Sequence, residues 1–148
     1  MAETKFMQLR LVTLLGIKFD EPVYEVMLPS KTGQITVFPM HQPLVTLLDP
    51  GPMIIRHHKD DPDMKLEYLA LSGGVAKITH SEVIILADEA ESDREIVEKE
   101  ARDAYDRAVA AAKSVTDHIE LEEARRLVQH QAARLKIAEL RRRHRDIK

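Results

Sequence analysis

The stretch Ala87-Asp-Glu-Ala-Glu-Ser92-Asp-Arg-Glu95 divides the chain into two parts of different character. All five glycines and all seven prolines of the 148 residues precede it, and neither residue type occurs after Gly74. Turn-rich sequence followed by a long stretch without helix breakers is typical of a β part followed by a helical part. We predict a boundary at Asp88–Ser92, with a β domain over residues 1–88 and a helical domain over residues 89–148.

Before this boundary, short apolar runs alternate with turns rich in Pro, Gly and Asp. Strand-like runs spaced roughly 8–12 residues apart predict a sandwich or a small barrel, and we expect an antiparallel β-sandwich. The segment His57–Asp63 is expected to be a solvated hairpin tip rather than a metal site, because it has no apolar residue to bury. The predicted strands are Gln8–Thr13, Tyr24–Leu28, Gln34–Phe38, Val45–Leu48, Met53–Arg56, Leu66–Leu71, Val75–Thr79 and Glu82–Ala87.

After the boundary, two sequence signals predict helix starts. Ser92 to Glu95 fits a capping box. In this motif the serine hydroxyl accepts a hydrogen bond from the backbone amide of the glutamate, and the glutamate carboxylate accepts one from the backbone amide of the serine. Asp117 to Glu120 fits a second one. The first helix has a nearly all-alanine face, and the second, of about 27 residues, is roughly 40 Å long. Two helices joined at Thr116-Asp117 predict an antiparallel αα-hairpin.

The composition excludes several classes of site. The chain has no Cys, which excludes a disulfide scaffold, a thiolate metal site and a thiol nucleophile. No apolar run approaches the ~20 residues that span a bilayer. Neither a nucleophile elbow nor a glycine-rich phosphate loop occurs. We therefore expect no catalytic residue, no metal site and no cofactor.

The basic end of the chain is its sharpest charge feature. Arg141, Arg142, Arg143 and Arg145 follow Arg134 in the second predicted helix. Cations in a last helical turn match the helix dipole, which accounts for one or two of them. The cluster is thus either a solvated, dipole-matched helix end or a docking surface for an acidic protein or a polyanion.

Several short motifs follow one another in a characteristic order. Together with the plan of strands followed by a helical hairpin, this order resembles the epsilon subunit of the bacterial F-type ATP synthase. The motifs are Leu28-Pro-x-x-x-Gly33, Phe38-Pro-x-His41-x-Pro-Leu44, Pro50-Gly51, Leu71-Ser-Gly-Gly74, Val83-x-x-Leu-Ala-Asp88-x-Ala90 and Leu135-Lys-Ile-Ala-Glu-Leu140.

The resemblance implies a ten-stranded β-sandwich followed by an αα-hairpin, so two short strands would be missing from the eight predicted above. It implies a non-catalytic rotor subunit of the central stalk that couples proton flow to ATP synthesis. Its partners would be the gamma subunit and the c-subunit ring, at the cytoplasmic face of the bacterial cell membrane. The subunit would meet the membrane only through the complex, as a peripheral component, and would bind no nucleic acid.

The resemblance also implies which residues carry these roles. The helices would lie compact on the sandwich or extend to the alpha and beta subunits of the catalytic head, where they inhibit ATP hydrolysis. Arg134, Arg141, Arg142, Arg143 and Arg145 would form the inhibitory tail. The interface with the c ring and the gamma subunit would comprise Lys31, Thr32, Gly33, Met40, His41 and Gln42, on two loops facing the membrane side of the rotor.

One motif departs from the family pattern. Some members bind ATP through Ile/Leu-Asp-x-x-Arg-Ala at the start of the first helix. The aligned residues here are Ile96, Val97, Glu100 and Ala101, so valine replaces the aspartate and glutamate replaces the arginine. A carboxylate in place of a phosphate-facing cation disfavours a polyanion, and we expect ATP to bind weakly or not at all.

An alternative reading of the same plan is a free-standing β-sandwich adaptor with a dimerising helical hairpin. A nucleic-acid-binding module that uses the basic tail is a third reading. The net charge of −3 and the low aromatic content of 4% argue against it.

Overall fold

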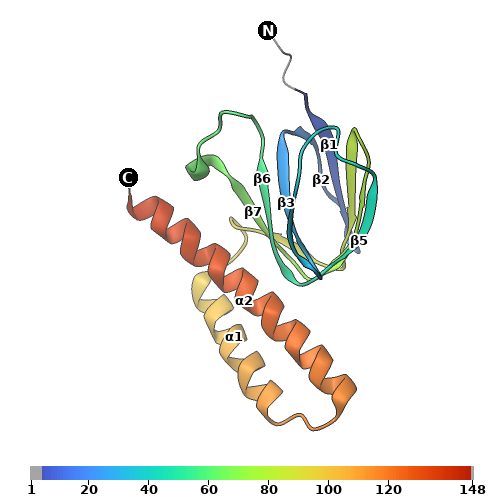
Figure 1. Ribbon diagram of the computed structural model, residues 1–148. Coiled ribbons are helices and arrows are strands. Elements are labelled where there is room, and N and C mark those ends of the chain that lie inside the picture. The colour runs from blue at the N-terminus through green and yellow to red at the C-terminus, as the bar shows by residue number, and fades with distance from the viewer. Residues whose placement is uncertain (1–4, 148) are drawn as a thin grey trace.

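The computed structural model describes residues 5–147, which form ten strands followed by two long helices (Figure 1). A short 3₁₀ helix, Asp63–Lys65, lies between the sixth and seventh strands. The helices are α1 (Glu98–Lys113) and α2 (His118–Asp146). The strands are β1 (Met7–Thr13), β2 (Gly16–Val23), β3 (Glu25–Ser30), β4 (Gly33–Val37), β5 (Leu44–Leu48), β6 (Gly51–Arg56), β7 (Glu67–Leu71), β8 (Gly74–Ile78), β9 (Glu82–Leu86) and β10 (Ala90–Ser92).

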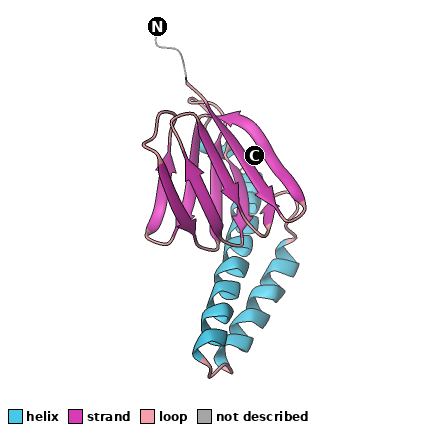
Figure 2. Ribbon diagram, turned by 90° about the vertical axis from the view of Figure 1, so that its right-hand side faces the viewer, coloured by secondary structure: helices cyan, strands magenta, loops and turns pink. Residues whose placement is uncertain are grey.

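The strands form one continuous hydrogen-bonded sheet that folds over into a sandwich, with the hairpin against it (Figure 2). The order is β10-β7-β6-β3-β5-β8-β9-β1-β2, with β4 paired to β3. All pairs are antiparallel except β1 with β9, which is parallel. The core is almost entirely aliphatic, because Phe19 is its only aromatic member among the described residues. The predicted fold, a sandwich followed by a two-helix hairpin, is confirmed, and the parallel pair is an addition to it.

All eight predicted strands form, and two further strands complete the sheet. The expectation that the missing strands are short holds for β10, which has 3 residues, and is wrong for β2, which has 8. Only Phe19 and Val23 of β2 are buried. Such a mostly exposed edge strand lacks the apolar alternation by which strands are recognised in sequence.

The predicted first helix start is wrong. Ser92 is the last residue of β10 and pairs with Leu69 of β7, which holds its backbone extended. Half of the capping box does form, since the Ser92 amide donates to the Glu95 carboxylate at 2.7 Å. The segment then makes a turn, and α1 begins only at Glu98.

The second helix start is confirmed. The Asp117 carboxylate accepts the amides of Ile119 and Glu120 at 2.9 and 3.1 Å, so Asp117 caps α2. The two helices form the predicted antiparallel hairpin, whose closed tip projects beyond the sandwich (Figures 1 and 2). With 29 residues, α2 is about 44 Å long.

The segment His57–Asp63 is confirmed as a mostly exposed tip between the antiparallel strands β6 and β7, in which His57 is half-buried. Nε2 of His57 lies 2.8 Å from the Glu67 carboxylate, and the His57 side chain is only 26% exposed. Residues 5–147 contain no group of three or more His, Cys, Asp or Glu placed to hold a metal ion.

Candidate functional site

The sandwich and the hairpin share a small buried cluster of alanines and isoleucines. Helix α2 packs over β6 and β7. Tyr68 and Leu135 border a buried cluster that joins the two parts. Its members are Ala70, Ile96, Ala101, Ile137 and Ala138. Ile96 and Ile137 supply most of the apolar area of this cluster and the three alanines add less, each contributing in proportion to the area buried, at roughly 25 cal/mol per Å².

Arg134 adds a charged contact to this interface. Its guanidinium donates to both carboxylate oxygens of Glu91 on β10, at 2.6 and 3.3 Å. A third bond, of 2.7 Å, runs to the side-chain oxygen of Gln131. The Arg134 side chain is only 17% exposed, and a bidentate pair in such partial shelter is stronger than a surface ion pair.

Arg141 holds the segment between the sandwich and α1. Its guanidinium donates to the backbone carbonyls of Asp93 and, at 2.7 Å, Ile96. Lys18 of β2 also binds this segment, donating to the Glu95 carboxylate at 2.6 and 2.8 Å. The Lys18 ammonium, followed by the Ser92 amide, lowers the pKa of Glu95. We refer to Arg134 and Arg141 together as the arginine latch, because Arg134 ties α2 to β10 and Arg141 ties it to the segment that follows β10.

The predicted inhibitory arginines therefore divide into separate groups. Arg142 pairs with Glu98 at 2.7 Å and joins the two helices to each other. Arg143 and Arg145 are exposed and form no ion pair with another of residues 5–147. In the compact arrangement, only these two of the five arginines are without an ion pair or a backbone partner among residues 5–147.

The predicted loop residues do not lie together. Lys31 and Thr32 form the turn where β3 and β4 meet, at the Ser30–Gly33 end of the ladder. Met40, His41 and Gln42 follow the opposite end of β4, where the Met40 amide donates to the His80 carbonyl at 2.7 Å. The two loops thus occupy opposite ends of the sandwich, and one end cannot present both.

The residues of the ATP motif serve the packing of the hairpin. Ile96 and Ala101 are buried at 1% and 0% exposure in the cluster that joins hairpin and sandwich. Val97 and Glu100 face solvent. The nearby Arg102 already pairs with Glu139 at 3.1 Å. At the two positions where the family motif has Asp and Arg, this surface therefore offers an added phosphate a valine and a carboxylate.

His130 is a buried titratable group that the sequence did not reveal. It lies on α2, facing Glu89 and Glu91 beside β10 and Arg134 on its own helix, and is 9% exposed. Burial lowers the pKa of His130 below its usual 6.5. A lone histidine in a charged helix carries no sequence signal of burial. The strand beside it, β10, was not predicted from the sequence either.

This burial makes the compact arrangement sensitive to mild acid. When the hairpin is released, His130 regains its usual pKa of 6.5, whereas burial in the docked state disfavours protonation. The released state therefore binds more protons as pH falls through 6.5, and docking weakens. We expect faster amide hydrogen exchange in the second half of α2 at pH 5.5 than at pH 7.5, after correction for intrinsic rates. A His130→Gln variant should lose most of this dependence. His118→Gln is the matched control, because His118 is exposed at the start of the same helix. Equal pH dependence in all three proteins would contradict the prediction.

No helix among residues 5–147 is long and apolar enough to cross a membrane.

Comparison with known proteins assigns the family. The model of the ATP synthase delta/epsilon chain β-sandwich domain matches residues 6–93, from just before β1 to just after β10. The ATP synthase epsilon chain of Nostoc punctiforme is 42% identical over 98 residues, covering 66% of this chain and 69% of the relative. The chloroplastic epsilon chain of Oltmannsiellopsis viridis is 35% identical over 118 residues, covering 80% and 86%.

The fold is also found in solved structures. A chain in the cryo-EM structure of the Euglena gracilis mitochondrial ATP synthase, OSCP/F1/c-ring, matches 95% of this chain and 84% of its own length, with a TM-score of 0.75 and 21% identity. A chain in the central stalk/c-ring structure from Tetrahymena thermophila matches with a TM-score of 0.59 and 12% identity. At these identities the likeness concerns the fold, including the helical hairpin that lies outside the family model. From its matched sandwich and its relatives, this chain belongs to the ATP synthase delta/epsilon family, as an epsilon chain.

Proposed function

We propose that this epsilon chain is a non-catalytic rotor subunit of an F-type ATP synthase, coupling proton flow to ATP synthesis. The sandwich docks on the gamma subunit and the c ring, as a peripheral component at the cytoplasmic face of a bacterial cell membrane. The hairpin moves between the compact arrangement and an extended one that reaches the alpha and beta subunits. The observation that carries this proposal is the hairpin interface, because a small buried cluster and two arginines hold the hairpin on the sandwich in place of a large shared core.

The energetics of this interface fit a two-state element. The buried cluster is small, and the closed tip of the hairpin projects beyond the sandwich. An element of this kind responds to a partner that binds only one of its states. The exposed Arg143 and Arg145 are the groups that an acidic surface of the catalytic head would attract first.

The surface around His41 supports docking on a stalk partner. Phe38, Met40, Leu44 and Val45 are 43%, 56%, 41% and 67% exposed and lie in the Met40–Gln42 loop or within three residues of it in sequence. Grouped large apolar side chains on a surface mark protein interfaces. We propose that this patch contacts the gamma subunit, while the Lys31–Gly33 turn at the opposite end contacts the c ring.

Cysteine crosslinking in the assembled synthase tests this orientation. The chain has no natural Cys, so single cysteines at Lys31 and at Met40 report on one position each. We expect Lys31→Cys to crosslink to the c ring and Met40→Cys to the gamma subunit, because the two loops lie at opposite ends. Crosslinks of both positions to the ring, or of both to the catalytic head, would refute the proposed placement.

A second test concerns nucleotide. We expect the isolated chain to bind ATP with a dissociation constant above the millimolar range, because Glu100 replaces a phosphate-facing arginine and Arg102 is already paired. Isothermal titration calorimetry measures this directly. A V97D/E100R double variant restores the family motif and should bind more tightly. Tight ATP binding by the unmodified chain would show that other residues form a nucleotide site.

A further inference from the structure

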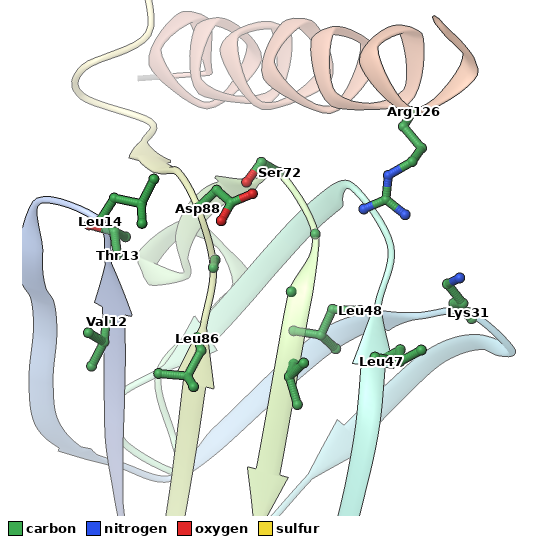
Figure 3. Close-up of a pocket in the computed structure, with 14 residues that line it drawn as sticks. Val12, Thr13, Leu14, Lys31, Leu47, Leu48, Ser72, Leu86, Asp88 and Arg126 are labelled. Carbon is green, nitrogen blue, oxygen red and sulfur yellow. The ribbon is translucent and has the colours of Figure 1, made fainter. Parts of the chain in front are cut away.

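A groove lies where one end of the sandwich faces α2 (Figure 3). Its volume is about 510 Å³, which is within the range of small-molecule sites. The floor is formed by the ends of β1, β5, β8 and β9, and α2 forms the roof. The turn between β3 and β4 closes one side. The site is thus shared between the sandwich and the movable hairpin.

Two cations stand at one side of this groove. Arg126 points from α2 towards the strand ends, and Lys31 of the β3–β4 turn lies on the same side (Figure 3). Neither side chain forms an ion pair with another of residues 5–147. A Cβ atom at Gly73 would lie 2.8 Å from Nη2 of Arg126, so the glycine provides the room for this guanidinium.

The rest of the lining is mainly apolar. Leu14, Leu47 and Leu86 are 82%, 53% and 54% exposed and would be covered by an occupant. Asp88 lies on the side away from the two cations (Figure 3). A ligand that satisfies both sides has an anionic head near Arg126 and Lys31 and an aliphatic body over the leucines.

Since both cations are exposed, apolar burial must supply much of the affinity of such a ligand.

We propose that this groove binds a small soluble amphipathic anion, a carboxylate or phosphate on an aliphatic body. The head bridges Arg126 of the hairpin and Lys31 of the sandwich, and repulsion from Asp88 fixes its direction. Because the complete site exists only while α2 lies over the sandwich, the ligand stabilises the compact arrangement by linkage. Its site is separate from the Ile96–Ala101 motif.

The first test uses the isolated full-length chain, so it does not depend on the proposed rotor function. Octanoate and octyl phosphate are titrated by NMR below their critical micelle concentrations. Octanol tests the aliphatic body alone, and inorganic phosphate tests the anionic head alone. We expect saturable binding of both anions, with shifts at Gly73, Gly74 and Arg126. Octanol and inorganic phosphate should bind at least tenfold more weakly.

Matched variants locate the head group. Arg126→Gln should weaken octanoate binding about threefold to tenfold, and K31Q/R126Q should weaken it further. Arg125→Gln is the control. The Arg125 guanidinium pairs with Glu122 at 3.2 Å, and this residue does not line the groove. Three outcomes would overturn the proposal. They are equal affinity of all variants for octanoate, chemical-shift changes outside the groove, and binding to phosphatidylglycerol vesicles without binding to octanoate.

A second measurement tests the link to the hairpin. Saturating octanoate should slow amide hydrogen exchange in α2 at least threefold in the unmodified chain and leave it unchanged in K31Q/R126Q. Binding without slower exchange would refute the linkage. Heteronuclear spectra of each variant establish that it retains the fold before its affinity is compared.

Discussion

An Arg141→Glu substitution is expected to release the helical hairpin from the β-sandwich. The change removes two charge-assisted hydrogen bonds and places a carboxylate against the carbonyls of Asp93 and Ile96. Hydrogen bonds to charged groups contribute about 1.5–3 kcal/mol each, so the loss is of the order of 3 kcal/mol, or more than a hundredfold in population. Hydrogen exchange and limited proteolysis of residues 93–97 measure the release.

Arg143→Glu is the matched control for this experiment. It makes the same charge change two residues along the same helix, at an exposed side chain that touches no carbonyl of the connecting segment. We expect its exchange rates to stay within twofold of the unmodified chain. If both variants released the hairpin equally, general charge repulsion and not the geometry of Arg141 would hold the compact arrangement.

Deleting residues 118–148 is expected to raise ATP hydrolysis several-fold in the assembled synthase while assembly remains intact. The sandwich keeps its own core and both docking loops, so loss of α2 spares the stalk contacts. The proposed inhibition by the extended hairpin should end, because the deletion removes its basic end. ATPase rates and subunit stoichiometry of purified complexes are the measurements. An unchanged rate would mean that the hairpin is not inhibitory in this enzyme.

Charge reversals within the tail should separate two opposite effects. R143E/R145E removes the exposed charges proposed to grip the head and should raise hydrolysis, as the deletion does. R134E/R141E opens the arginine latch and should lower hydrolysis, because more hairpin is free to extend. The difference between R143E/R145E and the unmodified enzyme should shrink in 1 M salt, where the Debye length is about 3 Å. Reversing all the tail arginines together mixes both effects.

Much of this fold could be predicted because its strands carry strong local signals. The buried strands alternate or are continuously apolar, and the absence of Gly and Pro after Gly74 indicates the hairpin. β2 escaped prediction because solvent covers most of its side chains. The Ser92 capping box was misleading for a different reason, since pairing of Ser92 with Leu69 overrides the local preference for a helix start.

The candidate site was less predictable than the fold. A run of arginines looks uniform in sequence, yet Arg141 contacts backbone carbonyls while Arg143 faces solvent. The helical period places neighbouring residues on different faces, and only tertiary structure decides what each face meets. The same limit applies to His130. It lies almost forty residues after β10 in the chain, and its burial depends on the packing of α2 beside that strand.

The parallel pairing of β1 with β9 has a consequence for how the molecule is made. Leu9 lies beside Val83, so the sheet cannot close until most of the sandwich has left the ribosome. Contacts this distant along the chain form slowly, whereas a helical hairpin forms from local contacts within microseconds. The hairpin follows the sandwich in the chain, so all ten strands have been synthesised before α1 and α2 are complete. Docking of the hairpin on the finished sandwich is then the last step of folding, and we expect release of the hairpin in the mature protein to reverse only that step.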